Sequence, residues 1–111
     1  MTKFIVIYYM PAAVVAQMQS MTPEQMQAGM EPWMKWAEEC GDGLVDMGTP
    51  LSNGQNVSAS GSTPSKREVT GFSILQAEDM AAAQAMLTGH PHFGYGEGCE
   101  IEVHESMPMS M

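Results

Sequence analysis

Residues 4–9, with the sequence FIVIYY, form a segment that has no polar side. Its β-branched and aromatic residues predict a strand, and side chains alternate between the two faces of a strand. One face would carry Phe4, Val6 and Tyr8, and the other Ile5, Ile7 and Tyr9. Both faces therefore need cover, and this requirement limits the folds that are open to the chain.

A helix is predicted over residues 23–40, because Thr22, Pro23 and Gln25 form a capping box with proline at the first helical position. Pro32 is expected to kink or restart this helix, since proline removes a backbone donor. Apolar residues at helical spacing form one predicted packing stripe: Met26, Met30, Trp33, Ala37 and Cys40. We interpret the methionines as packing residues rather than as a copper site.

The remaining elements follow from turn residues and periodicity. Residues 44–47 predict a short strand, Asn53-Gly54 a tight turn, residues 55–60 a hairpin return and residues 61–65 a loop. Residues 69–75 predict a strand, residues 78–88 an Ala-rich helix, and residues 99–104 a last strand. A short helical turn is expected after Pro11.

This order predicts one α+β domain over residues 1–111, of the ferredoxin-like βαββαβ type, with four antiparallel strands and two helices on one face. Two helices cover only one face of the sheet. We therefore expect the other face to be buried against a second copy, which makes the protein a homodimer. In the last strand Glu100, Glu102 and His104 should share the face away from the helices, either lining a partly wet cleft at the partner or lying in solvent.

The charge balance excludes several partners. Four Lys and Arg oppose 13 Asp and Glu, which gives a net charge of -9, so nucleic acid and anionic membrane surfaces are not expected to bind. No apolar run approaches the roughly 20 residues of a membrane span. Two cysteines without a CxxC pair do not form a disulfide scaffold, and we expect a cytoplasmic protein with reduced thiols.

His90-Pro91-His92 follows a helix stop and is the segment in which chemistry is most expected. One hypothesis makes His90 a general acid or base that is oriented by Asp46 or Glu102. The alternative is that His90 caps the end of the preceding helix. Asp46 has two interpretations as well: a carboxylate that points into a cavity, or an outward residue held by a turn hydrogen bond.

The aromatic residues near this segment are candidate ligand contacts. Trp33, His92, Tyr95 and Glu102 would line a small-molecule cleft, with packing in the core as the other interpretation of the tryptophan. His90, His92 and His104 have suitable chemistry for zinc, but an HxH pair in a loop is a weak signal, and we expect neither a metal nor another cofactor. Gly94, Gly96 and Gly98 lack the features of a phosphate loop.

The segments FIVIYY, GLVDMGTPL, VTGFSIL, HPHF and GCEIEVHESMPM occur in an order that resembles the YCII-related family, close to its DGPF-type branch. This resemblance covers essentially the whole chain and implies a dimeric α+β barrel. Some members are regarded as small-molecule enzymes with a His-Asp pair, and others as accessory proteins. The enzyme-like members have a histidine in the first helix, where this chain has Glu31-Pro32-Trp33.

Two functions remain open from the sequence. The first is a protein with a small-molecule cleft at the dimeric barrel and acid–base chemistry by His90 with Asp46, as a lyase, isomerase or hydrolase. The second is a non-catalytic accessory or ligand-sensing module. The identity of the small molecule is not encoded in a recognisable motif.

Overall fold

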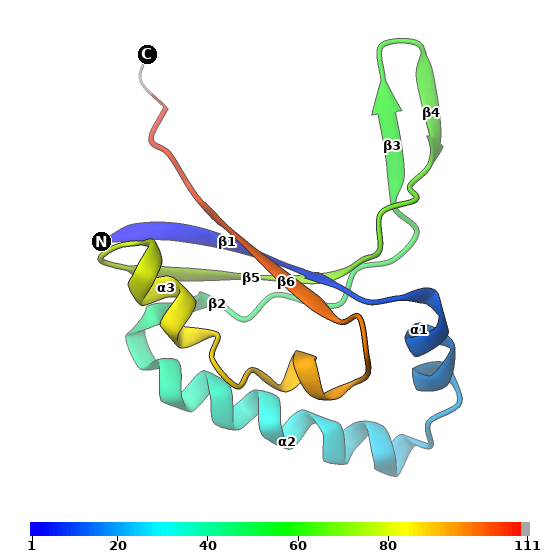
Figure 1. Ribbon diagram of the computed structural model, residues 1–111, viewed down its shortest axis with the longest axis horizontal. Helices are drawn as coiled ribbons and strands as arrows, with labels where there is room; N and C mark the ends of the chain where they lie inside the picture. The colour runs from blue at the N-terminus through cyan, green and yellow to red at the C-terminus, as the bar shows by residue number, and fades with distance from the viewer. Residues whose placement is uncertain (110–111) are drawn as a thin grey trace.

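The computed structural model describes residues 1–109 and has an α+β architecture (Figure 1). Its strands are β1 (Thr2–Tyr9), β2 (Leu44–Asp46), β3 (Gln55–Ser58), β4 (Gly61–Pro64), β5 (Val69–Ala77) and β6 (Glu100–Glu105). Its helices are α1 (Ala12–Gln19), α2 (Pro23–Cys40) and α3 (Met80–Met86), with short 3-10 turns η1 (Gly41–Gly43) and η2 (Pro91–Gly94). No helix within residues 1–109 is long and apolar enough to cross a membrane.

The main sheet has the strand order β2-β5-β1-β6, and all neighbouring strands in it are antiparallel. Together with α2 and α3 this is the predicted ferredoxin-like βαββαβ topology, so the fold prediction is confirmed. The central strand β1 places Val6 opposite Ser73 of β5 and opposite Val103 of β6. Side chains at these positions share one face of the sheet.

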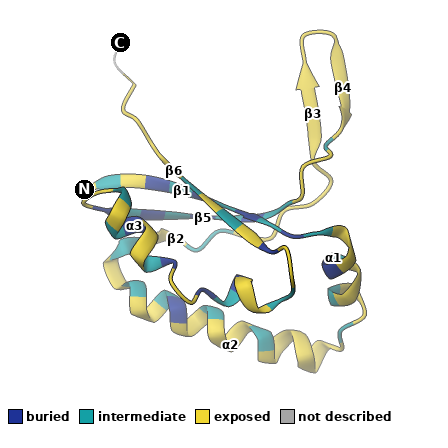
Figure 2. Cartoon of the chain, viewed as in Figure 1, coloured by how far each residue is buried: buried dark blue, intermediate teal, exposed yellow. Residues whose placement is uncertain are grey.

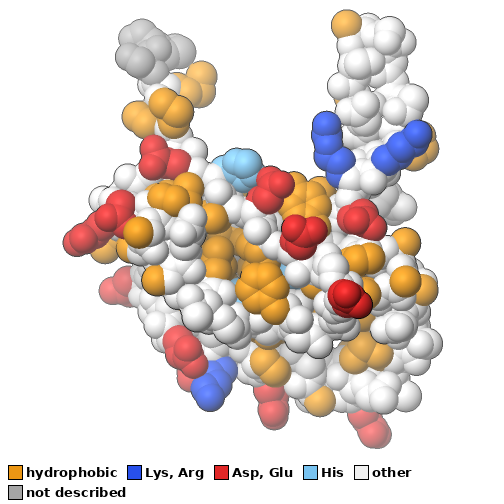
Figure 3. All heavy atoms as spheres, in the orientation of Figure 1, with side chains coloured by type: hydrophobic (Ala, Val, Ile, Leu, Met, Phe, Trp, Pro, Cys, Tyr) orange, Lys and Arg blue, Asp and Glu red, His pale blue; other side chains and the backbone are white. Residues whose placement is uncertain are grey.

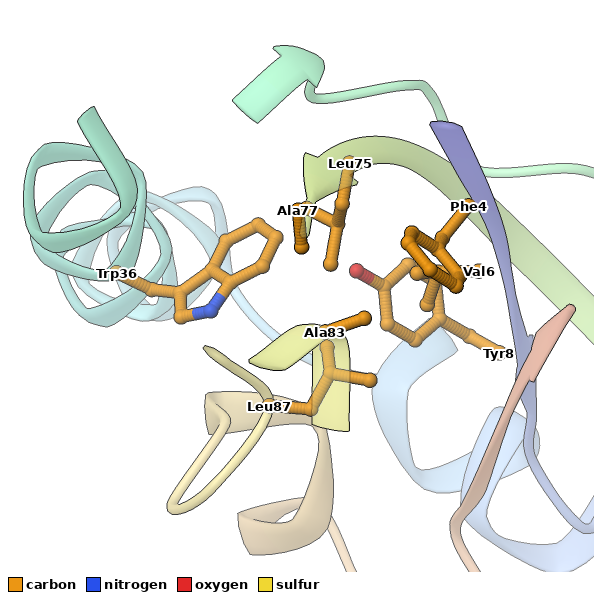
Figure 4. Close-up of a cluster of buried hydrophobic side chains, with 8 residues drawn as sticks. All are labelled: Phe4, Val6, Tyr8, Trp36, Leu75, Ala77, Ala83 and Leu87. Carbon is orange, nitrogen blue, oxygen red and sulfur yellow. The ribbon is translucent and has the colours of Figure 1, made fainter. Parts of the chain in front are cut away.

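The helices cover this face, and the core lies between them and the sheet (Figure 4). Phe4 and Val6 of β1 and Leu75 of β5 are fully buried, and Trp36 reaches them from α2. The alternation predicted for residues 4–9 therefore decides which side chains enter the core. The core cluster consists of Phe4, Val6, Tyr8, Trp36, Leu75, Ala77, Ala83 and Leu87.

The opposite face of the sheet has no helix over it (Figures 1 and 2). In register it carries Ile5 and Ile7 of β1 beside Phe72 and Ile74 of β5, and all four are only half-buried. We call these four residues the uncovered face. The sequence requirement for cover on both sides of β1 is thus met on one side only within a single chain.

Helix α2 confirms one prediction and corrects two. The Thr22 capping box is present as expected. Pro32, however, does not restart the helix, which runs without a break from Pro23 to Cys40. The carbonyl that Pro32 leaves without a helical partner is that of Ala28, at an exposed position where water can bind it. The predicted packing of the methionines is wrong: the exposed fractions of Met26, Met30 and Met34 are 58%, 51% and 55%, and only the side of α2 with the tryptophans faces the sheet.

A separate hairpin of β3 and β4 projects from the sheet on the side away from the helices (Figure 1). The predicted loop over residues 61–65 is therefore mostly strand, because Gly61–Pro64 pairs with Gln55–Ser58. We call residues 55–64 the arm. Every residue of the arm is exposed (Figure 2), so nothing in a single chain covers it.

Candidate ligand site at the buried histidine pair

The segment between α3 and β6 turns His90 and His92 into the core. Gly89, with a φ of 68°, follows the end of α3, and Pro91 begins η2. His90 Nδ1 accepts a hydrogen bond of 3.0 Å from the backbone N–H of His92. His90 thus caps the turn that follows it. The interpretation of His90 as a cap of the preceding helix does not describe this arrangement, because the C-cap of α3 is Leu87.

A chain of hydrogen bonds leads from His90 across the sheet. The Ser73 hydroxyl donates to the Met47 carbonyl at 2.7 Å, which uses its single proton. Tyr8 must therefore donate to Ser73, at 2.8 Å, and the Tyr8 oxygen in turn accepts from His90 Nε2, at 3.2 Å. This count fixes His90 as the neutral tautomer that carries its proton on Nε2.

Both imidazoles are inaccessible, with exposed fractions of 2% each. His92 Nε2 donates to the Tyr9 carbonyl at 2.8 Å. Within the described part of the chain, no buried side-chain nitrogen or oxygen lacks a partner. The polar groups of this cluster are consequently fully satisfied, as buried polar networks must be to avoid a large desolvation cost.

Aromatic rings surround His90. Its ring centroid lies 4.6 Å from that of Trp33 and 4.4 Å from that of Trp36, both close to edge-on. Trp36 Nε1 donates to the Met86 carbonyl at 2.8 Å, and Trp33 Nε1 donates to the Tyr95 hydroxyl. We call Tyr8, Trp33, Trp36, His90, His92 and Tyr95 the aromatic–histidine cluster. The structure thus brings together the predicted contacts Trp33, His92 and Tyr95 around His90.

Burial keeps the cluster uncharged near neutral pH. Desolvation, helped by the neighbouring His92, lowers the pKa of His90 to about 4, and desolvation also lowers the pKa of His92. The same burial raises the pKa of Tyr8 to about 12. Near neutral pH the cluster therefore contains two neutral imidazoles, those of His90 and His92, and the neutral phenol of Tyr8.

Asp46 is not brought to His90. It lies opposite Ile74, on the uncovered side of the sheet, and is exposed, whereas His90 lies on the helix side. Its Oδ1 accepts a hydrogen bond of 2.8 Å from the backbone N–H of Gly48, so the turn interpretation of Asp46 is the one that the geometry supports. Both ring nitrogens of His90 have other partners, Tyr8 and His92.

Glu102 also lies away from the cluster. It is paired in register with Ile7, on the uncovered side, as the predicted alternation of the last strand required. Its carboxylate lies 2.7 Å from His104 Nε2, and this hydrogen bond lowers the pKa of Glu102. Both side chains are more than half exposed, so the pair lies in solvent in a single chain.

Tyr8 and Trp36 of the cluster, and Ser73, which is hydrogen-bonded to Tyr8, were not predicted as site residues. A signal for two of them was present in the alternation of the strands. Tyr8 follows Phe4 and Val6 at a spacing of two, and Ser73 precedes Leu75 at the same spacing. A hydroxyl at a position that alternates with buried residues of a strand predicts a hydrogen-bonding partner for it in the core.

Two hollows on the surface lie elsewhere. One of about 640 Å³ runs along the outer side of α2, and one of about 310 Å³ lies at the base of the arm. Neither is lined by His90 or His92. Across residues 1–109, no three His, Cys, Asp or Glu side chains are grouped closely enough to hold a metal ion.

Comparison with known proteins assigns the family. A 5-chloro-2-hydroxyhydroquinone dehydrochlorinase from Burkholderia phenoliruptrix AC1100, solved in complex with 2,5-dihydroxybenzoquinone, is similar over 92% of this chain and 91% of its own, with 14% sequence identity and a TM-score of 0.48. No curated protein matches the chain. The family model described as "YCII-related domain" matches residues 1–107. The DGPF-type branch stays a prediction, but this match shows that the chain belongs to the YCII-related family.

Proposed function

We propose that this chain is a small-molecule-binding module that acts as a homodimer and catalyses no reaction of its own. Its ligand site is the aromatic–histidine cluster between the sheet and α2. One observation carries the proposal: the core of a chain of 111 residues contains a continuous series of hydrogen bonds through His90, Tyr8 and Ser73. Burying polar groups in so small a core costs free energy. Proteins depart from an all-apolar core mainly at functional sites, so we interpret these polar groups as part of such a site.

The entrance to this site is the contact between Trp33 and Tyr95. Both residues are half-buried, and they close the cluster from outside through the indole N–H and the phenol oxygen. A ligand that separates them would contact the ring of Trp33, whose centroid lies 4.6 Å from that of His90. It would accept from the Nε2–H of His90 only by displacing the Tyr8 oxygen, which now accepts that bond. A flat molecule with a hydrogen-bond acceptor on its edge fits these groups best.

Acid–base chemistry by His90 is the second candidate. The observation that favours it is the Tyr8 oxygen 3.2 Å from His90 Nε2, since a phenol and an imidazole in contact can exchange a proton. Asp46 has no part in this version, because it lies on the other side of the sheet. The lone pair on His90 Nδ1 accepts from the His92 N–H, so a catalytic base would require that η2 first turn away. Binding without reaction is the better supported function.

The homodimer part of the proposal is supported by the uncovered face. Ile5, Ile7, Phe72 and Ile74 form an apolar patch at the centre of the sheet, where a second sheet can pack. Both cysteines are free, which suits a reducing compartment, and we propose the cytoplasm. Light scattering at micromolar concentration should give the mass of two chains, and Ile7→Glu should give the mass of one.

The ligand proposal is tested by NMR with selective detection of the two indole N–H signals. A panel of flat small molecules with edge acceptors is added to the wild type, to Trp33→Phe and to His104→Gln. We expect a compound that shifts the Trp33 signal, raises the melting temperature of the wild type and of His104→Gln, and loses at least about tenfold in affinity with Trp33→Phe. Mass spectrometry should recover it unchanged, because conversion of the compound would favour the acid–base candidate instead. Equal affinity for Trp33→Phe would show that the ligand binds elsewhere.

A further inference from the structure

The arm, residues 55–64, is the part of the molecule that a single chain leaves unexplained. It is a two-stranded sheet by itself, and its one large apolar side chain, Val57, has an exposed fraction of 75%. A lone two-stranded hairpin is at best marginally stable in water. The radius of gyration is 15.4 Å, whereas a compact chain of this length is expected near 13 Å. The arm therefore makes the single chain less compact, and its residues are not buried by any other part of that chain.

The direction of the arm indicates what it contacts. It projects beyond the uncovered face, away from the helices (Figure 1). This is the side on which the second copy of the proposed homodimer lies. Since the arm extends past its own sheet, the surface that it can cover belongs to that second copy.

The charges indicate which part of the second copy. Residues 55–67 contain Lys66 and Arg67, two of the four basic residues of the chain, and no acidic residue. Residues 97–105, which lead into and include β6, contain four glutamates: Glu97, Glu100, Glu102 and Glu105. Figure 3 shows the basic side chains at the base of the arm and acidic side chains on the body of the same chain below it. In the part of the chain that the structure describes, neither Lys66 nor Arg67 forms an ion pair.

Strand β6 also has a free edge. It is the last strand of the order β2-β5-β1-β6, so one row of its backbone N–H and C=O groups has no neighbouring strand in the described chain. Such an edge binds a further strand readily unless it is covered. The acidic side chains and the free edge lie on the same element, which is therefore the best match for an uncharged hairpin with Lys66 and Arg67 at its base.

We propose that the arm of each copy crosses to the second copy and lies along its edge strand β6, with Lys66 and Arg67 opposite Glu100 and Glu102 of the partner subunit. This inference rests on the proposed homodimer and adds its interlocking element. Because a two-fold axis relates the copies, both arms make the same contact. The contact buries Val57 and covers the edge of the partner's sheet.

The test compares two charge reversals of equal size. Lys66→Glu lies at the base of the arm, and Lys35→Glu is exposed on the outer side of α2, so each changes the net charge by two. Analytical ultracentrifugation at low salt should show that Lys66→Glu, the variant matched to Lys35→Glu, raises the dimer Kd by about threefold or more. The double variant Lys66→Glu with Arg67→Glu changes the net charge by four and should raise the Kd by about tenfold or more. Lys35→Glu should leave the Kd within about twofold. Adding Glu100→Lys and Glu102→Lys to the arm variant should restore most of the affinity.

The possible failures separate the two proposals. If Lys66→Glu/Arg67→Glu dimerises as tightly as the wild type, the arm contact is wrong but the proposed homodimer is not contradicted. A wild type that is monomeric at about 100 µM overturns both. Hydrogen exchange gives an independent measurement: the amides of residues 55–64 should be protected in the wild type and lose that protection in the Ile7→Glu monomer. Rapid exchange of the arm in a wild-type dimer would contradict the proposal.

Discussion

The hydroxyl of Tyr8 lies 3.2 Å from Nε2 of His90, and it links the loop after α3 to the centre of the sheet. Tyr8 comes from β1, near the start of the chain, and His90 from the segment before β6. The hydroxyl accepts from one side and donates to Ser73 on the other. It therefore connects His90 to Ser73 and, through Ser73, to the Met47 carbonyl.

Tyr8→Phe should lower the stability of the protein by about 1–3 kcal/mol, because it leaves the buried Nε2–H of His90 without an acceptor. Tyr9→Phe is the matched control, since Tyr9 lies on the other face of the same strand and is only half-buried. Urea denaturation of both variants measures the difference. Equal losses for the two variants would show that the hydroxyl of Tyr8 contributes nothing specific.

The protein should lose stability as the pH falls from about 6.5 toward 4. The unfolded chain binds protons on its histidines near pH 6.5, whereas the folded chain binds one on His90 only near pH 4. The unfolded state thus gains protons first, and the free energy of unfolding falls by at most about 1.4 kcal/mol per pH unit for each such histidine. His92, whose pKa is also lowered, adds to the effect in the same direction.

Denaturation curves between pH 7 and pH 4.5 test this expectation. His90→Gln should be less stable at pH 7 but should show a shallower acid slope, because one of the buried histidines is gone. His104→Gln removes an exposed histidine on the other side of the sheet, and it should leave the contribution of the two buried histidines to the slope in place. The same slope in His90→Gln and in the wild type would mean that His90 does not cause the acid sensitivity.

The fold was predictable because local signals and the overall topology agree. The two-sided apolar pattern of residues 4–9, the Thr22 capping box and the alternation of residues 99–104 each appear in the structure as the sequence predicts. The site was predictable only in part. Trp33, His90, His92 and Tyr95 lie together, as predicted for the cleft. The side of the sheet on which Asp46 lies depends on a register shift in the pairing of β2 with β5, and no residue type in the sequence predicts that shift.

The exposed methionines of α2 show that apolar residues at helical spacing in a sequence do not always pack in the core. Met30 and Met34 recur at helical spacing, yet the sheet is already covered by Trp33 and Trp36 on the adjoining side of the helix. Met30→Gln and Met34→Gln should therefore each change the stability by no more than about 0.5 kcal/mol. Leu75→Ala, at a fully buried position, should cost about 2–5 kcal/mol in the same denaturation assay. A loss above about 1 kcal/mol for either methionine variant would place that side chain in a packed interface.

Gly48 lies so close to β5 that its replacement should be among the most damaging of the substitutions considered. A Cβ atom at Gly48 would lie 1.7 Å from the backbone oxygen of Phe72, and its φ is 79°. Gly89 has a similar φ of 68°, but a Cβ there would meet nothing within 4 Å.

The pair Gly48→Ala and Gly89→Ala thus separates backbone strain from steric overlap. Gly89→Ala should cost about 1 kcal/mol, the ordinary penalty for a side chain in the left-handed region. Gly48→Ala adds an overlap that only a shift of β5 or of the turn after Asp46 can relieve, and it should either fail to fold or lose more than about 3 kcal/mol. Thermal and urea unfolding of the two variants measure this difference. Similar losses would show that the turn moves away from β5 at little cost, and that the hydrogen bond from Gly48 to Asp46 does not hold it in place.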